Sequence, residues 1–177
     1  MASLLRPRSP LLGHPLRLLL STVKYFAVLH LVWEYGYSLG PAQGPSMLPT
    51  VEVSDEWLIT SKRHRYGRGV GVGDLVVYKI PIFPNMDGMK RVLGMPGDYV
   101  LVGSPESGGD DMIQVPQGHC WLVGDNLPTS RDSRTFGPVP LALVYGKVIA
   151  TMRAPGPGFE FKWITNPLRS YSSTSES

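Results

Sequence analysis

One long apolar run, residues 18–39, sets the first limit on how this chain can fold. Its length suits a single transmembrane helix, which needs about 20 apolar residues to cross the hydrocarbon core of a bilayer. Lys24 and Glu34 lie toward the two ends of the run, where long charged side chains can reach the headgroups. Trp33 and the tyrosines that follow it form an aromatic belt at its C-terminal end. We therefore predict a membrane anchor helix over residues 18–39, with a helix lying on the membrane surface as the alternative.

The excess positive charge of the chain lies before and within this run. The net charge is +3, and residues 1–39 carry all of it. By the positive-inside rule, residues 1–17 stay on the negative side of the membrane and the remainder lies on the other side. Residues 1–17 contain arginines, serines and prolines but no acid, which is typical of a mitochondrial targeting segment. Because the charges after the run balance, we do not expect the chain to bind nucleic acid.

Residues 40–169 are predicted to form one mainly β domain. The chain contains Gly 20 and Pro 17, which favours short strands joined by turns. No helical period of useful length follows residue 40. The predicted strands are residues 57–60, 75–80, 91–93, 99–102, 115–123 and 145–152, with an acidic surface loop at 103–111. Residues 170–177 are rich in serine and threonine and are predicted to be a disordered tail.

The cysteine and histidine residues do not suggest a metal site or a disulfide. Cys120 is the only cysteine, so no intrachain disulfide can form, and we expect it to be a small buried hydrophobic residue. Its neighbour His119 does not make a metal site with it, and the other histidines show no ligand spacing. We therefore predict no cofactor and no metal. The basic cluster at residues 62–68 is predicted to be a solvated loop.

One serine stands in a stiff local sequence, Gly-Pro-Ser-Met-Leu-Pro-Thr at residues 44–50. Pro45 and Pro49 fix their own φ angles and disfavour helix for the residues before them. The segment is therefore predicted to be an extended turn that holds the hydroxyl of Ser46 in one place. A linker turn after the membrane anchor is the alternative interpretation.

A serine hydroxyl is a weak nucleophile unless a base lies within hydrogen-bond reach. The nucleophile-elbow pattern G-x-S-x-G is absent, because Leu48 occupies the position of the second glycine. His64 and His119 are possible bases. Lys90 is another, because apolar residues precede and follow it and burial would favour its neutral form. A lysine in solvent at the end of a strand remains the alternative.

Four segments become informative when they are read together: residues 44–50, 73–77, 90–98 and 124–137. They resemble, in the family order, the conserved boxes of the type I signal peptidases. Within that family, the single anchor and the Gly-His-Cys-Trp-Leu-Val-Gly-Asp-Asn sequence at 118–126 resemble subunit 1 of the mitochondrial inner membrane peptidase. Asp-Ser-Arg at 132–134 favours subunit 1 over subunit 2, and Phe-Lys-Trp-Ile at 161–164 is similar to fungal members of subunit 1.

The resemblance implies a role for each matching residue. Ser46 is implied to be the nucleophile, and its backbone N–H to contribute to the oxyanion hole. Lys90 is implied to be the general base. Ser130 resembles the serine whose hydroxyl orients the lysine amine. Asp132 and Arg134 resemble an ion pair that supports the wall of the active site.

The resemblance also implies the fold and the manner of substrate binding. The expected fold is an antiparallel signal-peptidase-like β fold with a single N-terminal membrane helix. An extended peptide would add to a strand edge, with small pockets selecting its side chains. Gly44 stands where some bacterial relatives have a serine hydroxyl as a second oxyanion donor. A different group, such as water, must then supply that donor here.

The function implied by the resemblance is that of a membrane-anchored serine endopeptidase in the mitochondrial inner membrane. Its catalytic domain would face the intermembrane space and remove sorting signals from precursor polypeptides, in a hetero-oligomer with a second peptidase subunit. One alternative is a signal peptidase of a bacterial or plastid membrane. Another is an inactive binding subunit of a peptidase complex, although the presence of both Ser46 and Lys90 argues against it.

Overall fold

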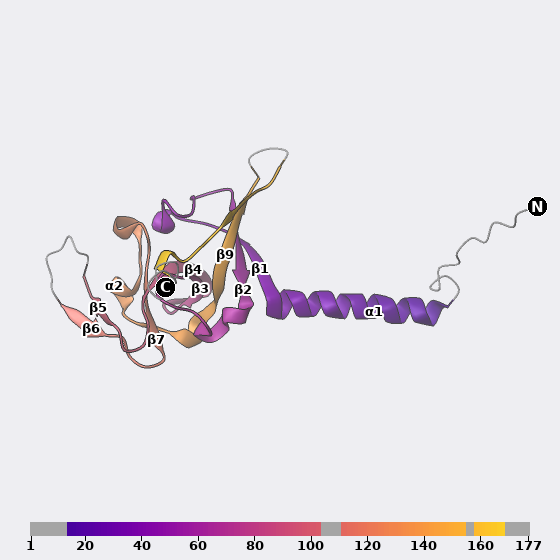
Figure 1. The fold of residues 1–177 in the computed structure, drawn as a ribbon, viewed down its shortest axis with the longest axis horizontal. Helices are drawn as coiled ribbons and strands as arrows, with labels where there is room; N and C mark the ends of the chain where they lie inside the picture. Colours follow the sequence, from indigo (N-terminus) through magenta and orange to yellow (C-terminus); the bar gives the residue numbers. More distant parts are fainter. Residues whose placement is uncertain (1–13, 104–110, 155–157, 169–177) are drawn as a thin grey trace, which may run out of the picture. The chain divides into compact units, whose positions relative to one another are not determined.

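The computed structural model describes residues 14–103, 111–154 and 158–168 (Figure 1). The chain divides into two compact units, one up to Gly36 and one from Tyr37 onward. Most of the predicted targeting segment, most of the predicted acidic loop and the predicted C-terminal tail lie outside the described residues.

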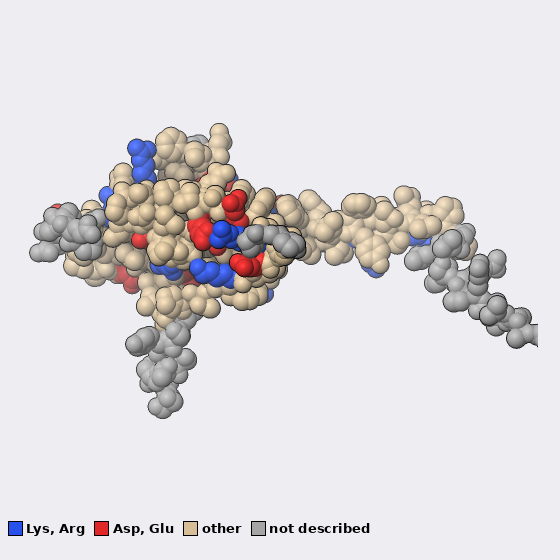
Figure 2. Space-filling model, turned by 90° about the horizontal axis from the view of Figure 1, so that it is seen from above, with Lys and Arg blue, Asp and Glu red and all other residues tan. Residues whose placement is uncertain are grey.

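The first unit contains one apolar helix. Helix α1, Pro15–Leu31, continues into a π-helical turn, Val32–Gly36, and none of these residues is buried. At 1.5 Å per residue the 22 residues extend about 33 Å, enough to cross a hydrocarbon core of about 30 Å. Nearly all of the surface of α1 in Figure 2 is free of charged side chains. The segment is therefore a candidate membrane span by length and composition.

The ends of this helix differ from the prediction of residues 18–39. The helix begins at Pro15, where a proline fits the first helical turn because its missing N–H is not needed there. It ends at Gly36, and residues 37–39 belong to a β-strand. Apolar composition alone could not distinguish these residues from the helix, because their strand conformation depends on pairing with a distant segment.

The second unit is built on antiparallel strands, as predicted. The strands are β1 Tyr37–Pro41, β2 Glu56–Ser61, β3 Leu75–Ile80, β4 Phe83–Gly94, β5 Tyr99–Leu101, β6 Met112–Gln114, β7 His119–Val123, β8 Val139–Pro140, β9 Val144–Arg153 and β10 Glu160–Trp163. Their order in the main sheet is β1-β2-β9-β3-β4-β7-β8, with β10 paired to β9 and β5-β6 forming a separate hairpin. The helical turns are η2 Pro45–Met47, η3 Lys62–Gly67, η5 Leu127–Thr129, α2 Ser133–Phe136 and η6 Leu141–Leu143. The fold is therefore mainly β.

Several predicted strand limits are wrong. Strand β4 begins at Phe83 and contains Pro84, whereas the sequence predicted a strand only over residues 91–93. The first half of β4 pairs with β3 through partners such as Tyr78 and Gly88, so pairing with the preceding strand overrides the local proline signal. Residues 115–118 are not a strand, because β7 begins at His119. Strands β1, β6, β8 and β10 were not predicted. Most of β1 was assigned to the anchor, and the other three are short strands whose pairing is visible only in the fold.

One hydrophobic cluster fixes the segment that carries the predicted nucleophile. Met47, directly after Ser46, is 2% exposed and packs with Leu58, Leu75 and Val148. These partners come from three different strands. The turn is therefore held in place by an apolar side chain inserted into the core.

Asp74 joins three parts of the fold in the Gly-Asp-Leu-Val-Val segment. Its carboxylate accepts hydrogen bonds from Lys147 Nζ at 2.7 Å and Asn166 Nδ2 at 2.7 Å, and from the Gly71 N–H at 3.1 Å. Burial alone would raise the pKa of Asp74, but these hydrogen bonds outweigh it and lower the pKa. The start of β3 is thereby tied to β9 and to the C-terminal segment.

The buried and the exposed ion pairs of β3 should differ in their effect on stability. We expect Asp74→Ala to lower the free energy of unfolding by about 3–5 kcal/mol, because it leaves the Lys147 charge buried without its partner. Asp87→Ala is the matched control. Its pair with Lys79 is about half exposed, so a loss below about 1 kcal/mol is expected. Urea unfolding followed by tryptophan fluorescence measures both variants, and equal losses would contradict the assignment.

Candidate active site

Ser46 lies in a short turn whose backbone geometry is set by its neighbours. Gly44 precedes the turn and has a φ of +91°, a backbone conformation that residues other than glycine rarely adopt. Pro45 starts the turn, and the Val51 N–H donates to the Met47 carbonyl at 3.0 Å. Ser46 is partly exposed, whereas Met47 after it is buried. The hydroxyl therefore stands at the surface of a rigid segment.

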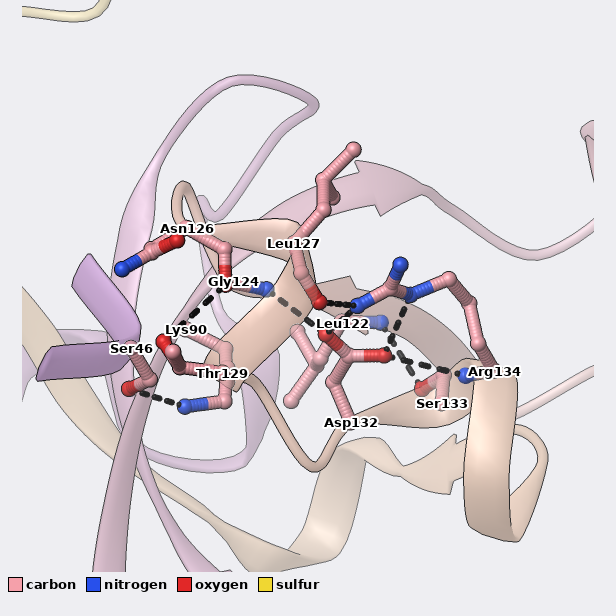
Figure 3. A network of polar contacts seen from close by, with 10 residues as sticks. All are labelled: Ser46, Lys90, Leu122, Gly124, Asn126, Leu127, Thr129, Asp132, Ser133 and Arg134. Carbon is pink, nitrogen blue, oxygen red and sulfur yellow. Dashed lines mark hydrogen bonds and ion pairs between the residues drawn. The ribbon is translucent and has the colours of Figure 1, made fainter. Parts of the chain in front are cut away.

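Lys90 contacts this hydroxyl directly. Lys90 Nζ donates a hydrogen bond to Ser46 Oγ at 2.6 Å (Figure 3). Lys90 lies within β4, opposite Val76 of β3, and is only 6% exposed. Burial lowers the pKa of its amine below the ordinary 10.5, while Asp132 and Asp125 oppose this change more weakly. The structure thus joins two residues that the sequence singled out separately.

The two histidines considered as bases lie elsewhere. His119 starts β7, opposite Pro140 of β8, and its Nδ1 lies 3.0 Å from the Gln117 carbonyl oxygen. His64 belongs to the turn η3, after β2. Within the residues that the structure describes, neither histidine forms a hydrogen bond with Ser46. Within the described residues, no group of three or more histidine, cysteine, aspartate or glutamate residues could hold a metal ion.

A loop after β7, residues 124–129, contacts the turn that carries Ser46, which we call the serine turn. We name this loop the clamp loop. The Asn126 N–H donates to the Ser46 carbonyl at 3.0 Å, and Asn126 Nδ2 donates to the Pro45 carbonyl at 3.0 Å. A Cβ atom on Gly124 would lie 2.5 Å from the Ser46 carbonyl oxygen. Only glycine fits at this position without displacing the turn.

The predicted pair of Asp132 and Arg134 forms, and it positions the clamp loop. Arg134 Nε and Nη2 donate to the two carboxylate oxygens, each at 2.9 Å. Asp132 also accepts from the Gly124 N–H at 3.0 Å, and Arg134 donates to the Leu127 carbonyl at 2.8 Å (Figure 3). Burial alone would raise the pKa of Asp132, but Arg134, the Gly124 N–H and the nearby Ser130 hydroxyl lower it.

Ser130 does not make the hydrogen bond to Lys90 that the resemblance implied. Its hydroxyl is buried and has no hydrogen bond of ordinary geometry within the described residues. It lies against Gly124, where an added Cβ would collide with it. The side chain therefore packs against Gly124 of the clamp loop.

A further, partly buried ion pair was not anticipated. Arg91 donates to both oxygens of Asp125, at 2.8 and 2.7 Å, and to the Gly73 carbonyl at 2.8 Å. Thr50 Oγ1 donates to the same carboxylate. Burial would raise the pKa of Asp125, but Arg91 and Thr50 lower it. These residues all lie in the four segments read together above. Only the fold shows that they join the serine turn, β4 and the clamp loop.

Comparison with known proteins identifies the family. The family model described as "Signal peptidase, peptidase S26" matches residues 16–106 and 103–153. The chain belongs to this family. As a peptidase of this family, it is 35% identical over 164 residues to mitochondrial inner membrane protease subunit 1 of Saccharomyces cerevisiae, covering 81% of this chain and 86% of that protein. It is 40% identical over 138 residues to the human protein of the same name, covering 77% and 82%.

Two further proteins are similar to this peptidase. Mitochondrial inner membrane protease subunit 2 of Saccharomyces cerevisiae is 32% identical over 146 residues, covering 79% of this chain and 81% of that protein. A solved signal peptidase I from Enterococcus faecalis has a TM-score of 0.36 and 24% identity, covering 44% of this chain and 95% of that one. The strand pairing of this chain defines its fold without reference to that structure.

The coupling of Asp132 to Arg134 can be measured with a double-mutant cycle. We expect each single change to alanine to cost about 3–5 kcal/mol of unfolding free energy, because the other charge stays buried without its partner. The double variant should lose less than the sum of the two, by about 1–3 kcal/mol. Urea unfolding of the three variants gives these values. A strictly additive cycle would show that the two side chains do not stabilise each other.

Proposed function

We propose that this peptidase is a membrane-anchored serine endopeptidase in which Ser46 is the nucleophile and Lys90 is the general base. The hydrogen bond from a buried lysine amine to a serine hydroxyl is the observation that carries this proposal. A general base must lie within hydrogen-bond reach of the proton that it removes. Burial lowers the pKa of Lys90, so its neutral form becomes accessible closer to neutral pH than for a lysine in water.

The proposed reaction passes through an acyl-enzyme. The neutral amine of Lys90 removes the hydroxyl proton as Ser46 Oγ attacks the scissile carbonyl carbon. The Lys90 ammonium then donates a proton to the departing amine, and the acyl group remains on Ser46. A water molecule, activated by the regenerated Lys90 amine, releases the acyl group and restores the serine.

The backbone N–H of Ser46 is the proposed oxyanion donor. Ser46 is the second residue of the turn η2, a position at which the N–H has no acceptor within the turn. Asn126 holds the carbonyls on either side of it, so the N–H has a fixed direction. A fixed donor stabilises a developing oxyanion without reorganisation during the reaction. Gly44 supplies the backbone conformation before the turn but no hydroxyl, and Ser130 supports the wall through its packing on Gly124.

A groove of about 320 Å³ is the proposed substrate site. One wall consists of β1 and the residues after it, from Ser38 to Gln43, and another contains Asp87, Gly88 and Met89 of β4. The first wall ends three residues before Ser46, and the second ends directly before Lys90. Strand β1 pairs with β2 on one edge, and its other edge is available for an extended peptide. A peptide in this groove would reach the dyad.

A larger cavity of about 590 Å³ is not assigned to the substrate. It lies between the β5-β6 hairpin and the clamp loop, with Tyr99, Met112 and Leu127 among its lining residues. Ser46 and Lys90 are not among the lining residues of either cavity. The smaller groove is preferred because β1, whose outer edge can pair with an extended peptide, forms one of its walls.

The proposed location is the mitochondrial inner membrane. Residues up to Gly36 would form a single-pass anchor, and the unit from Tyr37 onward would face the intermembrane space. The names of the similar proteins favour this location over a bacterial or plastid membrane. The proposed substrates are precursor polypeptides whose sorting signals are removed. Because the similar proteins include subunits 1 and 2 of one protease, we also propose a second peptidase subunit as partner.

The dyad is tested by substitutions that keep size or charge. Ser46→Ala and Lys90→Arg should each lower precursor cleavage by at least about 10³-fold, because one lacks the nucleophile and the other cannot shed its proton. Ser54→Ala and Lys79→Arg are the matched controls on exposed residues, and they should cleave at the normal rate. Cleavage is measured with purified full-length protein and radiolabelled precursors. Near-normal turnover by Lys90→Arg would exclude lysine as the base, and an active Ser46→Ala would exclude the nucleophile.

The pH dependence gives a separate test of Lys90. Only the neutral amine can accept the proton, so wild-type cleavage should rise as the pH passes upward through the pKa of Lys90. That midpoint should lie below 10.5, because burial lowers the pKa. The rate of acylation, measured in single-turnover experiments between pH 6 and about pH 10, reports it. A rate that is flat over this range, or that falls, would contradict the assignment.

A further inference from the structure

The basic cluster after β2 has no part in the proposed peptidase reaction. We name residues 62–69 the basic loop; its basic side chains are Lys62, Arg63, His64, Arg65 and Arg68. The sequence suggested an ordinary solvated loop. In the structure the loop follows Ser61, the last residue of β2, and Ser61 lies opposite Tyr37 in the β1-β2 register. The basic loop therefore sits at the end of the sheet where β1 begins.

Chain connectivity places this end of the sheet close to the membrane anchor. Tyr37 is bonded directly to Gly36, the last residue of the candidate span. Whatever the orientation of the folded unit, the start of β1 remains within one residue of that helix end. If the helix spans the membrane, as the proposed function requires, then Tyr37 and its cross-strand neighbours lie near the headgroups of the lipids.

A hollow of about 570 Å³ opens beside the basic loop. Its lining residues are Tyr37, Ser61, Arg63, His64, Arg68, Gly69 and Ile149. Two exposed arginines line it and no carboxylate does. Arg63 and Arg68 form no ion pair with a carboxylate within the part of the chain that the structure describes. Planar guanidinium groups match the oxygens of a phosphate, so the hollow suits an anionic phosphate group.

The other cations of the loop are turned toward the folded unit. Lys62 is 4% exposed, and its amine lies 5.3 Å from the centre of the Tyr145 ring. The Arg65 guanidinium lies 5.2 Å from the same ring. These contacts stabilise the loop from within and leave Arg63 and Arg68 as the cations that face outward.

Tyr66 adds an unusual exposed aromatic ring to this surface. Its φ is +60°, in the left-handed region that non-glycine residues rarely adopt, and 63% of the residue is exposed. The Arg68 guanidinium lies 6.0 Å from the centre of the ring. A strained backbone that presents an exposed tyrosine beside arginines points to a function for the surface. Tyrosine and arginine together are typical of residues at the headgroup level of a membrane.

We propose that the basic loop is a binding site for an anionic phospholipid, with Arg63 and Arg68 holding its phosphate. Tyr66 and Tyr37 would lie among the headgroups on either side of the bound lipid. This site rests on the membrane anchoring in the proposed function but not on the peptidase reaction. It would fix the folded unit at the membrane surface through a second contact besides the helix.

The test measures lipid binding to the full-length protein in neutral detergent micelles. Native mass spectrometry gives the apparent affinity for dioleoylphosphatidylglycerol, with dioleoylphosphatidylcholine as the uncharged reference. The wild type should prefer phosphatidylglycerol. Arg63→Gln combined with Arg68→Gln should weaken its binding about 30-fold, because each arginine near an anionic surface contributes roughly fivefold. Lysine at both positions should preserve most of the affinity, since the charge remains.

Matched variants separate this site from a general effect of charge. Lys79→Gln combined with Arg153→Gln removes the same charge from exposed or half-exposed sites elsewhere, and it should leave the affinity unchanged. Ser46→Ala should also bind phosphatidylglycerol normally, so a failure of the peptidase assignment would not affect this result. The proposal is overturned if the glutamine variant keeps its lipid affinity, which would favour an acidic protein surface as occupant. It is also overturned if the control loses as much affinity, or if the wild type shows no preference.

Discussion

The burial of one lysine amine is the constraint on which the candidate site depends. Lys90 can accept a proton from Ser46 only in its neutral form, and the sheet favours that form by removing the amine from water. The same burial would destabilise the fold if the lysine remained charged without a partner. The 2.6 Å hydrogen bond to Ser46 Oγ gives the buried amine a partner that requires no opposite charge. In the proposed mechanism, one contact therefore both satisfies the buried amine and carries the proton transfer.

The carboxylates near Lys90 would work against this arrangement if they were not neutralised. Asp132 and Asp125 both tend to raise the pKa of the lysine. Each of them is engaged by an arginine through both carboxylate oxygens, Asp132 by Arg134 and Asp125 by Arg91. The arginines reduce the negative field at the amine while they anchor the loops that surround it. The two ion pairs thus hold the clamp loop in place, and they also limit how far the carboxylates raise the pKa of Lys90.

The charge on the folded unit differs from the single-sign patch expected of a nucleic-acid-binding surface. On the face shown in Figure 2, acidic and basic side chains gather together instead of forming one large patch of a single sign. Arg153 and Glu52 form one exposed ion pair of the folded unit. The outward arginines of the basic loop, Arg63 and Arg68, differ from these paired charges, because no carboxylate lines the hollow beside them. Their loop follows Ser61, which pairs with Tyr37 directly after Gly36, so strand pairing links the loop to the end of the helix rather than to Ser46 and Lys90.

The sequence by itself determined the apolar anchor, the mainly β character of the remainder and the identity of the pair Ser46 and Lys90. These features are encoded locally, in composition, in proline positions and in short segments that resemble a family. It also indicated the ion pair of Asp132 and Arg134, which are only two residues apart. It misplaced the ends of the helix and of β4, because local composition shows neither the pairing of residues 37–39 with β2 nor the pairing of the first half of β4 with β3. The contacts of Asn126 with the serine turn, the engagement of Arg91 by Asp125 and the position of Ser130 against Gly124 were decided only by the tertiary structure. The local sequence does not show that these groups lie close together. They meet because Met47 is buried in the core and the strands pair as described.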